Sequence, residues 1–360
     1  MKNASFVAVL FAAIGLSACN KDTSTPFPGP PSSPTASASA SAKPTATPTP
    51  TAAPATAVRY TAIGASDAVG YGASVPCANP ATVAVPTCPG GTGYVPDIEG
   101  LLTSAGATVT LNDLGISGAV LGPDILATVN QYGALGTADQ CQPRTAGVDA
   151  YPADFITAEL PHLTGSETLV TVFAGGNDTN GIANAAACLS EASPPASAAQ
   201  IESFISTEIA AFGSDLTTLL TTIHTKAPNA KIYIANLPNF ALIPVGLEQS
   251  TAGQELLATI SVGIDQSVIN QTPSLGVPVV DLLCNPQSYV PANFYTDGFH
   301  PDDAGYAAFA AAFYAQIVAA TPAPPAASCS YASAEAHLRA VPSAPFRDFS
   351  RGKARTGKPL

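Results

Sequence analysis

Short apolar runs alternate along the chain with longer segments that carry apolar residues at helical spacing. The run at 168–173 is almost wholly apolar or β-branched, as a strand covered on both faces requires. The segment 201–226 repeats apolar residues every three or four positions, which predicts an amphipathic helix. On these grounds we expect strands at 59–64, 107–111, 168–173, 230–235 and 277–282, and helices at 93–104, 201–226, 253–270 and 302–318. This alternation predicts an α/β fold in which helices cover both faces of a parallel sheet.

Polar residues and glycines suited to catalysis follow four of the five predicted strands. Ser66 comes after the first strand, Gly118 after the second and Asn177 after the third. Asp297 and His300 follow the last strand and precede the last predicted helix. Right-handed crossovers place the carboxyl ends of parallel strands at one edge of the sheet, where ligands bind. We therefore expect these five residues to converge.

The five residues have the chemistry of nucleophilic catalysis. Ser66 is the candidate nucleophile, His300 can remove its proton, and Asp297 can hold the imidazole in position. The N–H groups of Ser66 and Gly118 and the side-chain amide of Asn177 can donate hydrogen bonds to an oxyanion. Each residue alone is a weak signal, because serine, glycine and asparagine are also common turn formers.

Taken together, four motifs resemble the blocks of the SGNH (GDSL-type) esterases and lipases. They read Gly64-Ala65-Ser66-Asp67 with a later Gly70, then Ser117-Gly118, then Gly175-Gly176-Asn177-Asp178, and last Asp297 to His300. Their order agrees with the family, and they span most of the predicted domain. The resemblance implies a flavodoxin-like, three-layer α/β/α fold with about five parallel strands. It also implies ester hydrolysis through an acyl-serine intermediate, with no metal and no cofactor.

Two positions depart from the family pattern. Ala65 stands where the family has aspartate, so a side chain that could brace the turn is missing. Asp67 stands where the family has leucine, and its carboxylate could oppose the oxyanion or cap the following helix. These departures leave a rival hypothesis open, a surface lipoprotein that binds glycan with the same fold but cleaves it weakly or not at all.

The ends of the chain predict export and anchoring. Residues 1–18 read as a signal peptide, with a charged start, an apolar run and small residues before Cys19. The stretch Leu16-Ser17-Ala18-Cys19 resembles a bacterial lipobox, which makes Cys19 the candidate lipidation site; ordinary secretion is the alternative.

The rest of the chain divides into three parts. The composition of residues 19–57 predicts a Pro/Ala/Ser/Thr-rich disordered tether, and residues 58–333 are the predicted hydrolase domain. Residues 334–360 predict a basic, disordered tail. We expect the protein in the bacterial cell envelope, held at the membrane through Cys19 or extracellular.

The predicted domain is strongly acidic. Residues 57–333 contain 22 Asp and Glu but four Lys and Arg, namely Arg59, Arg144, Lys226 and Lys231. Such a domain repels phosphate backbones, so nucleic-acid binding is disfavoured. Arg144 is the only basic residue in the long middle loops and is a weak candidate for steering an acidic substrate. A lipid or glycan ester remains the expected substrate class.

Six cysteines remain after Cys19, an even number that suggests three disulfides in an exported chain. Pairing each cysteine with its neighbour along the chain predicts Cys77–Cys88, Cys141–Cys188 and Cys284–Cys329. A zinc site is the alternative, but the chain has no Cys-x-x-Cys or Cys-x-x-His spacing.

Four stretches read as irregular loops, 75–93, 121–161, 179–200 and 240–252, and they give no readable substrate specificity. Four aromatic residues near the motifs could line a pocket or simply fill the core, namely Tyr71, Phe240, Tyr295 and Phe299.

Overall fold

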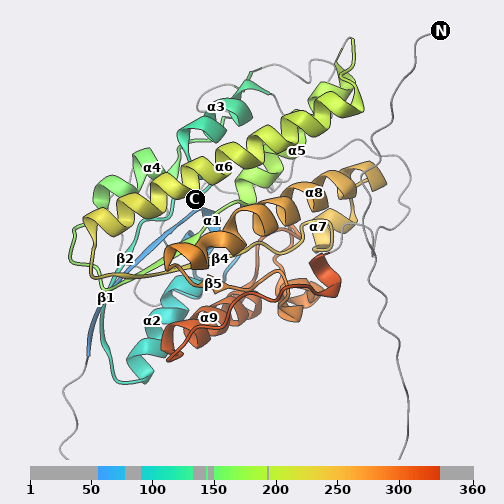
Figure 1. Cartoon of the computed structure of the whole chain (residues 1–360). Helices are drawn as coiled ribbons and strands as arrows, with labels where there is room; N and C mark the ends of the chain where they lie inside the picture. The colour runs from blue at the N-terminus through green and yellow to red at the C-terminus, as the bar shows by residue number, and fades with distance from the viewer. Residues whose placement is uncertain (1–55, 78–90, 133–142, 145–149, 193, 333–360) are drawn as a thin grey trace, which may run out of the picture. The chain divides into compact units, whose positions relative to one another are not determined.

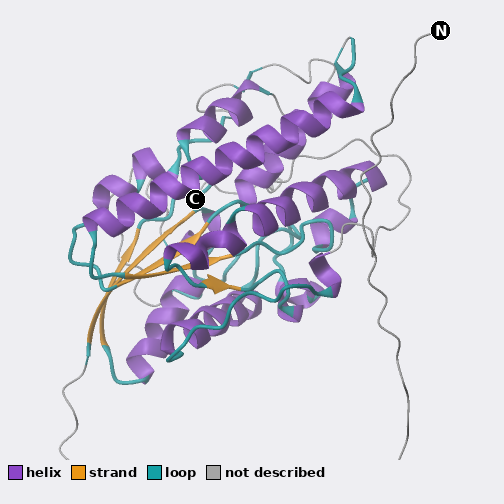
Figure 2. Ribbon diagram, in the orientation of Figure 1, coloured by secondary structure: helices purple, strands orange, loops and turns teal. Residues whose placement is uncertain are grey.

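A computed structural model describes residues 56–77, 91–132, 143–144, 150–192 and 194–332, and these carry a five-stranded parallel sheet (Figures 1 and 2). The strand order is β2-β1-β3-β4-β5. The bounds are β1 Ala57–Gly64, β2 Thr108–Asp113, β3 Leu169–Phe173, β4 Lys231–Ala235 and β5 Val279–Val280. This is the flavodoxin-like order, and it confirms the predicted α/β fold.

Helices cover both faces of the sheet. Helices α2 and α9 pack together on one face, and α3, α5, α6 and α8 pack on the other (Figure 1). The helix bounds are α1 Ser66–Val69, α2 Tyr94–Ser104, α3 Pro123–Gln131, α4 Phe155–Ala158, α5 Gly176–Glu191, α6 Ala198–Lys226, α7 Pro244–Leu247, α8 Thr251–Ser267 and α9 Asp303–Val318. Short 3-10 helices are η1 Leu160–His162, η2 Ile269–Leu275, η3 Pro286–Tyr289, η4 Pro291–Asn293 and η5 Ser330–Ala332.

None of the helices in these described residues is long and apolar enough to cross a membrane.

The strongest sequence patterns mark the elements that build the core. All five residues of β3 are buried, which agrees with a central strand covered on both faces. Helix α6 begins three residues before its predicted start, because Ser197 and Gln200 form a capping box there. Strand β5 is shorter than predicted, because its ladder with β4 covers only Val279 and Val280.

The prediction of an irregular loop at 179–200 is wrong over its first half, where α5 runs from Gly176 to Glu191. The helix is buried almost all round from Asn177 to Cys188. It therefore shows no alternation of apolar and polar faces, and its small and polar residues resemble a loop in sequence. The loops predicted at 121–161 and 240–252 also contain the helices α3, α4, α7 and η1. Three of these, α4, α7 and η1, are too short for a helical period to show.

The predicted helix at 253–270 ends earlier, at Ser267, and the chain continues as the 3-10 helix η2. Pro273 lies inside η2 and has no N–H to donate, so this segment cannot continue the α-helical hydrogen-bond ladder.

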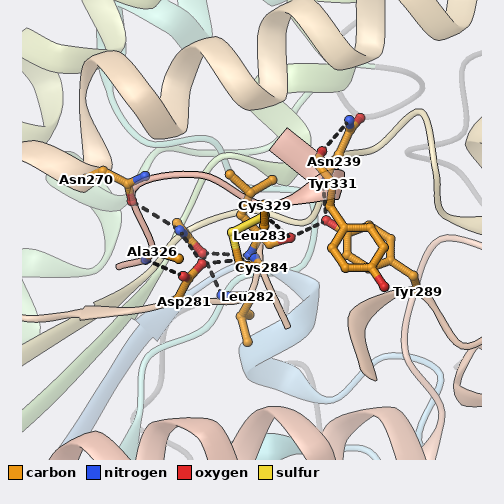
Figure 3. The surroundings of a disulfide bond; sticks show 11 residues. Asn239, Asn270, Asp281, Leu282, Leu283, Cys284, Tyr289, Ala326, Cys329 and Tyr331 are labelled. Carbon is orange, nitrogen blue, oxygen red and sulfur yellow. Dashed lines mark hydrogen bonds between the residues drawn. A yellow bond between two sulfur atoms is a disulfide. The ribbon is translucent and has the colours of Figure 1, made fainter. Parts of the chain in front are cut away.

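A disulfide joins Cys284 and Cys329, as the sequence predicted, and ties the segment after α9 to the loop after β5. Around it, the Asp281 carboxylate accepts from the N–H groups of Cys284 and Ala326, and the rings of Tyr289 and Tyr331 stack (Figure 3). Cys77 is also disulfide-bonded. Its predicted partner Cys88 lies outside the described residues, as does Cys141, so those pairings stay predictions. The signal peptide, Cys19, the tether and the basic tail lie outside them too.

Candidate active site

Ser66 lies at the start of α1, two residues after the end of β1. The N-cap residue is Ala65, and its carbonyl accepts from the N–H groups of Ala68 and Val69, which closes the turn. The first N–H groups of a helix have no acceptor within the helix, so the Ser66 N–H is available to a ligand. Ser66 is only 4% exposed, so it is buried at the edge of the sheet formed by the carboxyl ends of the strands.

His300 joins Ser66 to Asp297 in a continuous chain of hydrogen bonds. His300 Nε2 lies 2.8 Å from Ser66 Oγ, and His300 Nδ1 lies 2.7 Å from Asp297 Oδ2. The carboxylate fixes the tautomer, because the Nδ1–H donates to it and Nε2 is left to accept from the serine hydroxyl. The sequence prediction that these three residues converge matches this geometry.

Asp297 is held in its ionised form. Burial alone would raise its pKa, but the hydrogen bond and charge of His300, with the N–H groups of Phe299 and His300 on Oδ1, bring the pKa below its usual value. A carboxylate that stays ionised can stabilise an imidazolium at His300.

Gly118 lies in a tight turn after β2. The Ala119 N–H donates to the Ile116 carbonyl, and Gly118 has φ +82°, a conformation that favours glycine. The amide of the third residue of such a turn is not used within the turn, so the Gly118 N–H can donate outward.

Asn177, in the first turn of α5, is tied to the same turn. Its Nδ2 donates to the Ala119 carbonyl at 2.8 Å, and a side-chain amide has a second N–H to give. Its neighbour Asp178 points elsewhere, since its Oδ1 accepts from the Leu121 N–H and its side chain is fully buried. Asp178 thus has a structural role, which is to hold the Leu121 N–H.

A pocket opens to solvent next to these residues, and its empty space, open solvent included, is about 480 Å³. Ala65, Asp67, Ala119 and Asn177 line it, so it touches the serine turn, the Gly118 turn and α5 together. The rest of its wall is mostly apolar and comes from the end of β3, the start of α5, the loops after β3, β4 and β5, and α9. These residues are Phe173, Ala174, Gly175, Gly176, Leu237, Pro238, Phe240, Ile243, Phe294, Phe299, Pro301 and Phe309.

Asp67 places a carboxyl group in this wall. Burial raises its pKa, while the nearby His300 lowers it and Asp297 raises it further. The hypothesis that Asp67 caps the following helix is wrong, because α1 begins at Ser66 and its N-cap, Ala65, has no side-chain hydrogen bond.

Two of the four aromatic residues named from sequence, Phe240 and Phe299, line the pocket. The other two lie beside the histidine. The Tyr71 ring is 4.5 Å from the His300 ring, and Tyr295 meets Tyr71 edge to face at 6.2 Å. Gly72 makes this contact possible, because with φ +94° a Cβ there would lie 2.6 Å from the Pro301 carbonyl oxygen.

Glu159, which no sequence motif singles out, binds the backbone at the end of β1, just before the turn that carries Ser66. Its Oε2 accepts from the Gly64 N–H at 3.1 Å, and its side chain is fully buried. Burial raises the pKa of Glu159 well above its usual value, against the opposing effect of the Gly64 N–H.

This arrangement agrees with the family comparison. The profile of the GDSL-like Lipase/Acylhydrolase family matches residues 62–308, more than half of the chain. The chain belongs to this family. The GDSL-like chain is therefore a carboxylic ester hydrolase. The matched region includes the end of β1, the other four strands and all five predicted site residues.

Several solved structures are similar to this GDSL-like hydrolase. One is the lipase Lip_vut3 from a goat rumen metagenome (18% identity, 72% of this chain and 96% of that chain covered, TM-score 0.45). A second is phospholipase A1 from Streptomyces albidoflavus NA297 (17%, 72% and 98%, 0.44), and a third is a family 3 carbohydrate esterase from Clostridium thermocellum (17%, 72% and 94%, 0.38). None of the curated proteins compared with the chain matches it.

Proposed function

We propose that the chain is an exported serine esterase that cleaves carboxylic esters of lipids or acylated carbohydrates with a Ser66–His300–Asp297 triad. The observation that carries the proposal is the unbroken chain of hydrogen bonds from the Ser66 hydroxyl through His300 to the Asp297 carboxylate. A protein that only bound glycan would have no use for this alignment.

In the first half of the reaction, His300 Nε2 takes the proton of the Ser66 hydroxyl as Oγ attacks the ester carbonyl carbon. The carbonyl oxygen becomes an oxyanion. It accepts hydrogen bonds from the Ser66 N–H, the Gly118 N–H and the free N–H of Asn177. His300 then gives its proton to the leaving alcohol oxygen, and an acyl-serine remains.

In the second half, water replaces the alcohol. His300 takes a proton from the water, the hydroxide attacks the acyl-serine, and the carboxylic acid leaves as Ser66 regains its proton. The apolar pocket is the natural place for the acyl group, because Ala65 and Asn177 lie in its wall next to the nucleophile and the oxyanion donors. Its phenylalanine lining favours an acyl group larger than acetyl.

Export and lipid attachment at Cys19 are proposed from the sequence of residues 1–57, with a lipid anchor and a tether before the domain. Labelled palmitate should enter the wild-type chain in a bacterial host and not the Cys19→Ala chain. Equal labelling of both chains would refute the anchor without touching the esterase assignment.

The test of catalysis is hydrolysis of p-nitrophenyl esters from acetate to palmitate by the wild-type and Ser66→Ala proteins. We expect turnover by the wild type, a preference for chains longer than acetate, and loss of turnover in Ser66→Ala with an unchanged circular dichroism spectrum. A fluorophosphonate probe should label the wild type and not the variant. Turnover that survives in Ser66→Ala would refute the triad.

A further inference from the structure

The basic residues of the domain lie away from the active-site edge of the sheet. Arg59 is near the start of β1, Lys231 begins β4, and Lys226 ends α6, so all three are at the amino ends of the strands. A five-residue strand is about 16 Å long, about twice the Debye length of ~8 Å at physiological salt. Their charge is therefore largely screened at the site.

The fourth basic residue, Arg144, does not serve the site either, which leaves unsupported the suggestion that it steers an acidic substrate. It is 7% exposed, its Nε donates to the Val129 carbonyl, and its guanidinium lies 4.9 Å over the Tyr151 ring. The stretches between residues 57 and 332 that the structure leaves undescribed contain no Lys or Arg.

The active-site edge itself is acidic. Asp303, at the start of α9, accepts from the Ser74 N–H and the Thr92 hydroxyl, and these bonds hold its pKa below the usual value. Against the effect of burial, the hydrogen bonds and charge of His300 hold the pKa of Asp297 below its usual value, and Asp302, directly before Asp303, caps α9. Asp67 lies in the pocket wall, where burial raises its pKa, so the negative charge at this edge comes from Asp297 and Asp303. A field of this sign attracts cations.

The leaving alcohol must lie against His300, because this residue protonates it. Tyr71 is in ring contact with His300, and Tyr295, 42% exposed, extends the aromatic surface toward solvent. Neither tyrosine lines the acyl pocket. An aromatic face with nearby carboxylates is the environment that binds alkylammonium groups, since the ring face is negative.

We propose that the alcohol side of this site selects substrates by charge and binds best an ester whose alcohol carries a quaternary or protonated amine, held against Tyr71 and Tyr295. The inference rests on the proposed esterase function. It also requires that esters with anionic alcohols, such as phosphorylated or sulfonated ones, are poor substrates, because the same field repels them.

Three butyrate esters test the proposal with the full-length protein. They are choline butyrate, its uncharged isostere dimethylbutyl butyrate, and the butyrate ester of isethionate, which is anionic. All three release the same acid, so one pH-stat assay measures kcat/KM for each. We expect choline butyrate to exceed the isostere by about fivefold or more, and the anionic ester to fall below both. The differences should shrink between about 0.01 M salt, with a Debye length of about 30 Å, and about 1 M, with one of about 3 Å.

Variants of Tyr295 separate the aromatic contribution from general catalysis. The ratio of kcat/KM for choline butyrate to that for the isostere should persist in Tyr295→Phe and fall in Tyr295→Leu, whatever the absolute rates. A wild-type ratio of one or less, or an uncharged ester preferred at every salt concentration, overturns the proposal and favours a neutral alcohol such as a sugar. Hydrolysis that does not depend on Ser66 is a different failure and overturns the proposed function instead.

Discussion

The backbone N–H of Gly64 donates a hydrogen bond of 3.1 Å to Oε2 of Glu159, although the two residues are 95 positions apart. Gly64 ends β1 two residues before Ser66, so the bond fixes the strand end from which the nucleophile turn begins. In the family pattern an aspartate stands at position 65, where this chain has alanine. Glu159 therefore supplies, from the loop between α4 and η1, a brace that the Ala65 side chain cannot.

We predict that Glu159→Gln keeps most of the activity, because an amide oxygen can also accept from the Gly64 N–H and burial already disfavours the charged carboxylate. Glu159→Leu should leave that buried N–H unpaired and cost about 1–3 kcal/mol of stability. It should also lower kcat with little change in KM, since the serine turn is no longer fixed. Steady-state kinetics beside thermal unfolding test this. A Leu variant with lower stability but unchanged kcat would show that Glu159 only supports the fold.

Asp297 carries a second prediction. Asp297→Asn keeps the size of the side chain but lets the amide favour the wrong tautomer of His300, with the proton on Nε2 instead of Nδ1. We expect kcat to fall by about 10²–10⁴-fold with KM nearly unchanged. The fluorophosphonate probe should label Ser66 correspondingly slowly. A loss below about tenfold would mean that the contact of His300 with Tyr71 and Phe299 is enough to orient the ring.

The convergence of the candidate site residues could be predicted because each lies just beyond a strand whose apolar run is easy to recognise. Ser66, Asn177 and the pair Asp297 and His300 needed no knowledge of distant contacts, since parallel strands bring their carboxyl ends together. The same logic predicts the sheet but not its exact ends. Strand β5 is reduced to Val279 and Val280, because backbone pairing with β4 limits it.

Features that depend on long-range packing were not predictable. Helix α5 is hidden in sequence because it is buried all round and has no polar face, so residues such as Asn180 and Asn184 read as loop. Glu159 gives no signal, because its partner Gly64 is 95 positions away in the sequence and only the fold brings the two together. The pocket likewise gathers Phe173, Phe294 and Phe309 from three separate elements, and each looks like an ordinary core residue on its own.

Buried acids predict how stability changes with pH. Burial raises the pKa of Asp178 to about 7, against the opposing hydrogen bond from Leu121, whereas an unfolded aspartate has a pKa of about 3.9. The folded state therefore binds more protons between these two values, so stability is greatest at the acid side and falls as pH rises through about 7. Asp113, whose pKa burial also raises to about 7, adds to the same trend.

Asp178→Asn isolates this effect, because the amide oxygen can still accept from the Leu121 N–H while no charge can form. We expect the variant and the wild type to unfold alike near pH 5, and the variant to be more stable by about 1–3 kcal/mol near pH 8. Urea unfolding at both pH values measures the difference. Equal stability at pH 8 would mean that the folded Asp178 ionises freely, with no pKa shift.

The disulfide between Cys284 and Cys329 carries the last prediction. It closes a loop with a sequence separation of 45 residues, and loop-closure entropy predicts a stabilisation of about 4 kcal/mol for that length. The double variant Cys284→Ser with Cys329→Ser should therefore lose up to this amount in urea unfolding. Because the Tyr331 carbonyl accepts from Asn239 and the next residue, Phe240, lines the pocket, KM for long-chain esters should rise more than KM for acetate. Equal changes in both KM values would show that the disulfide stabilises the domain without shaping the acyl pocket.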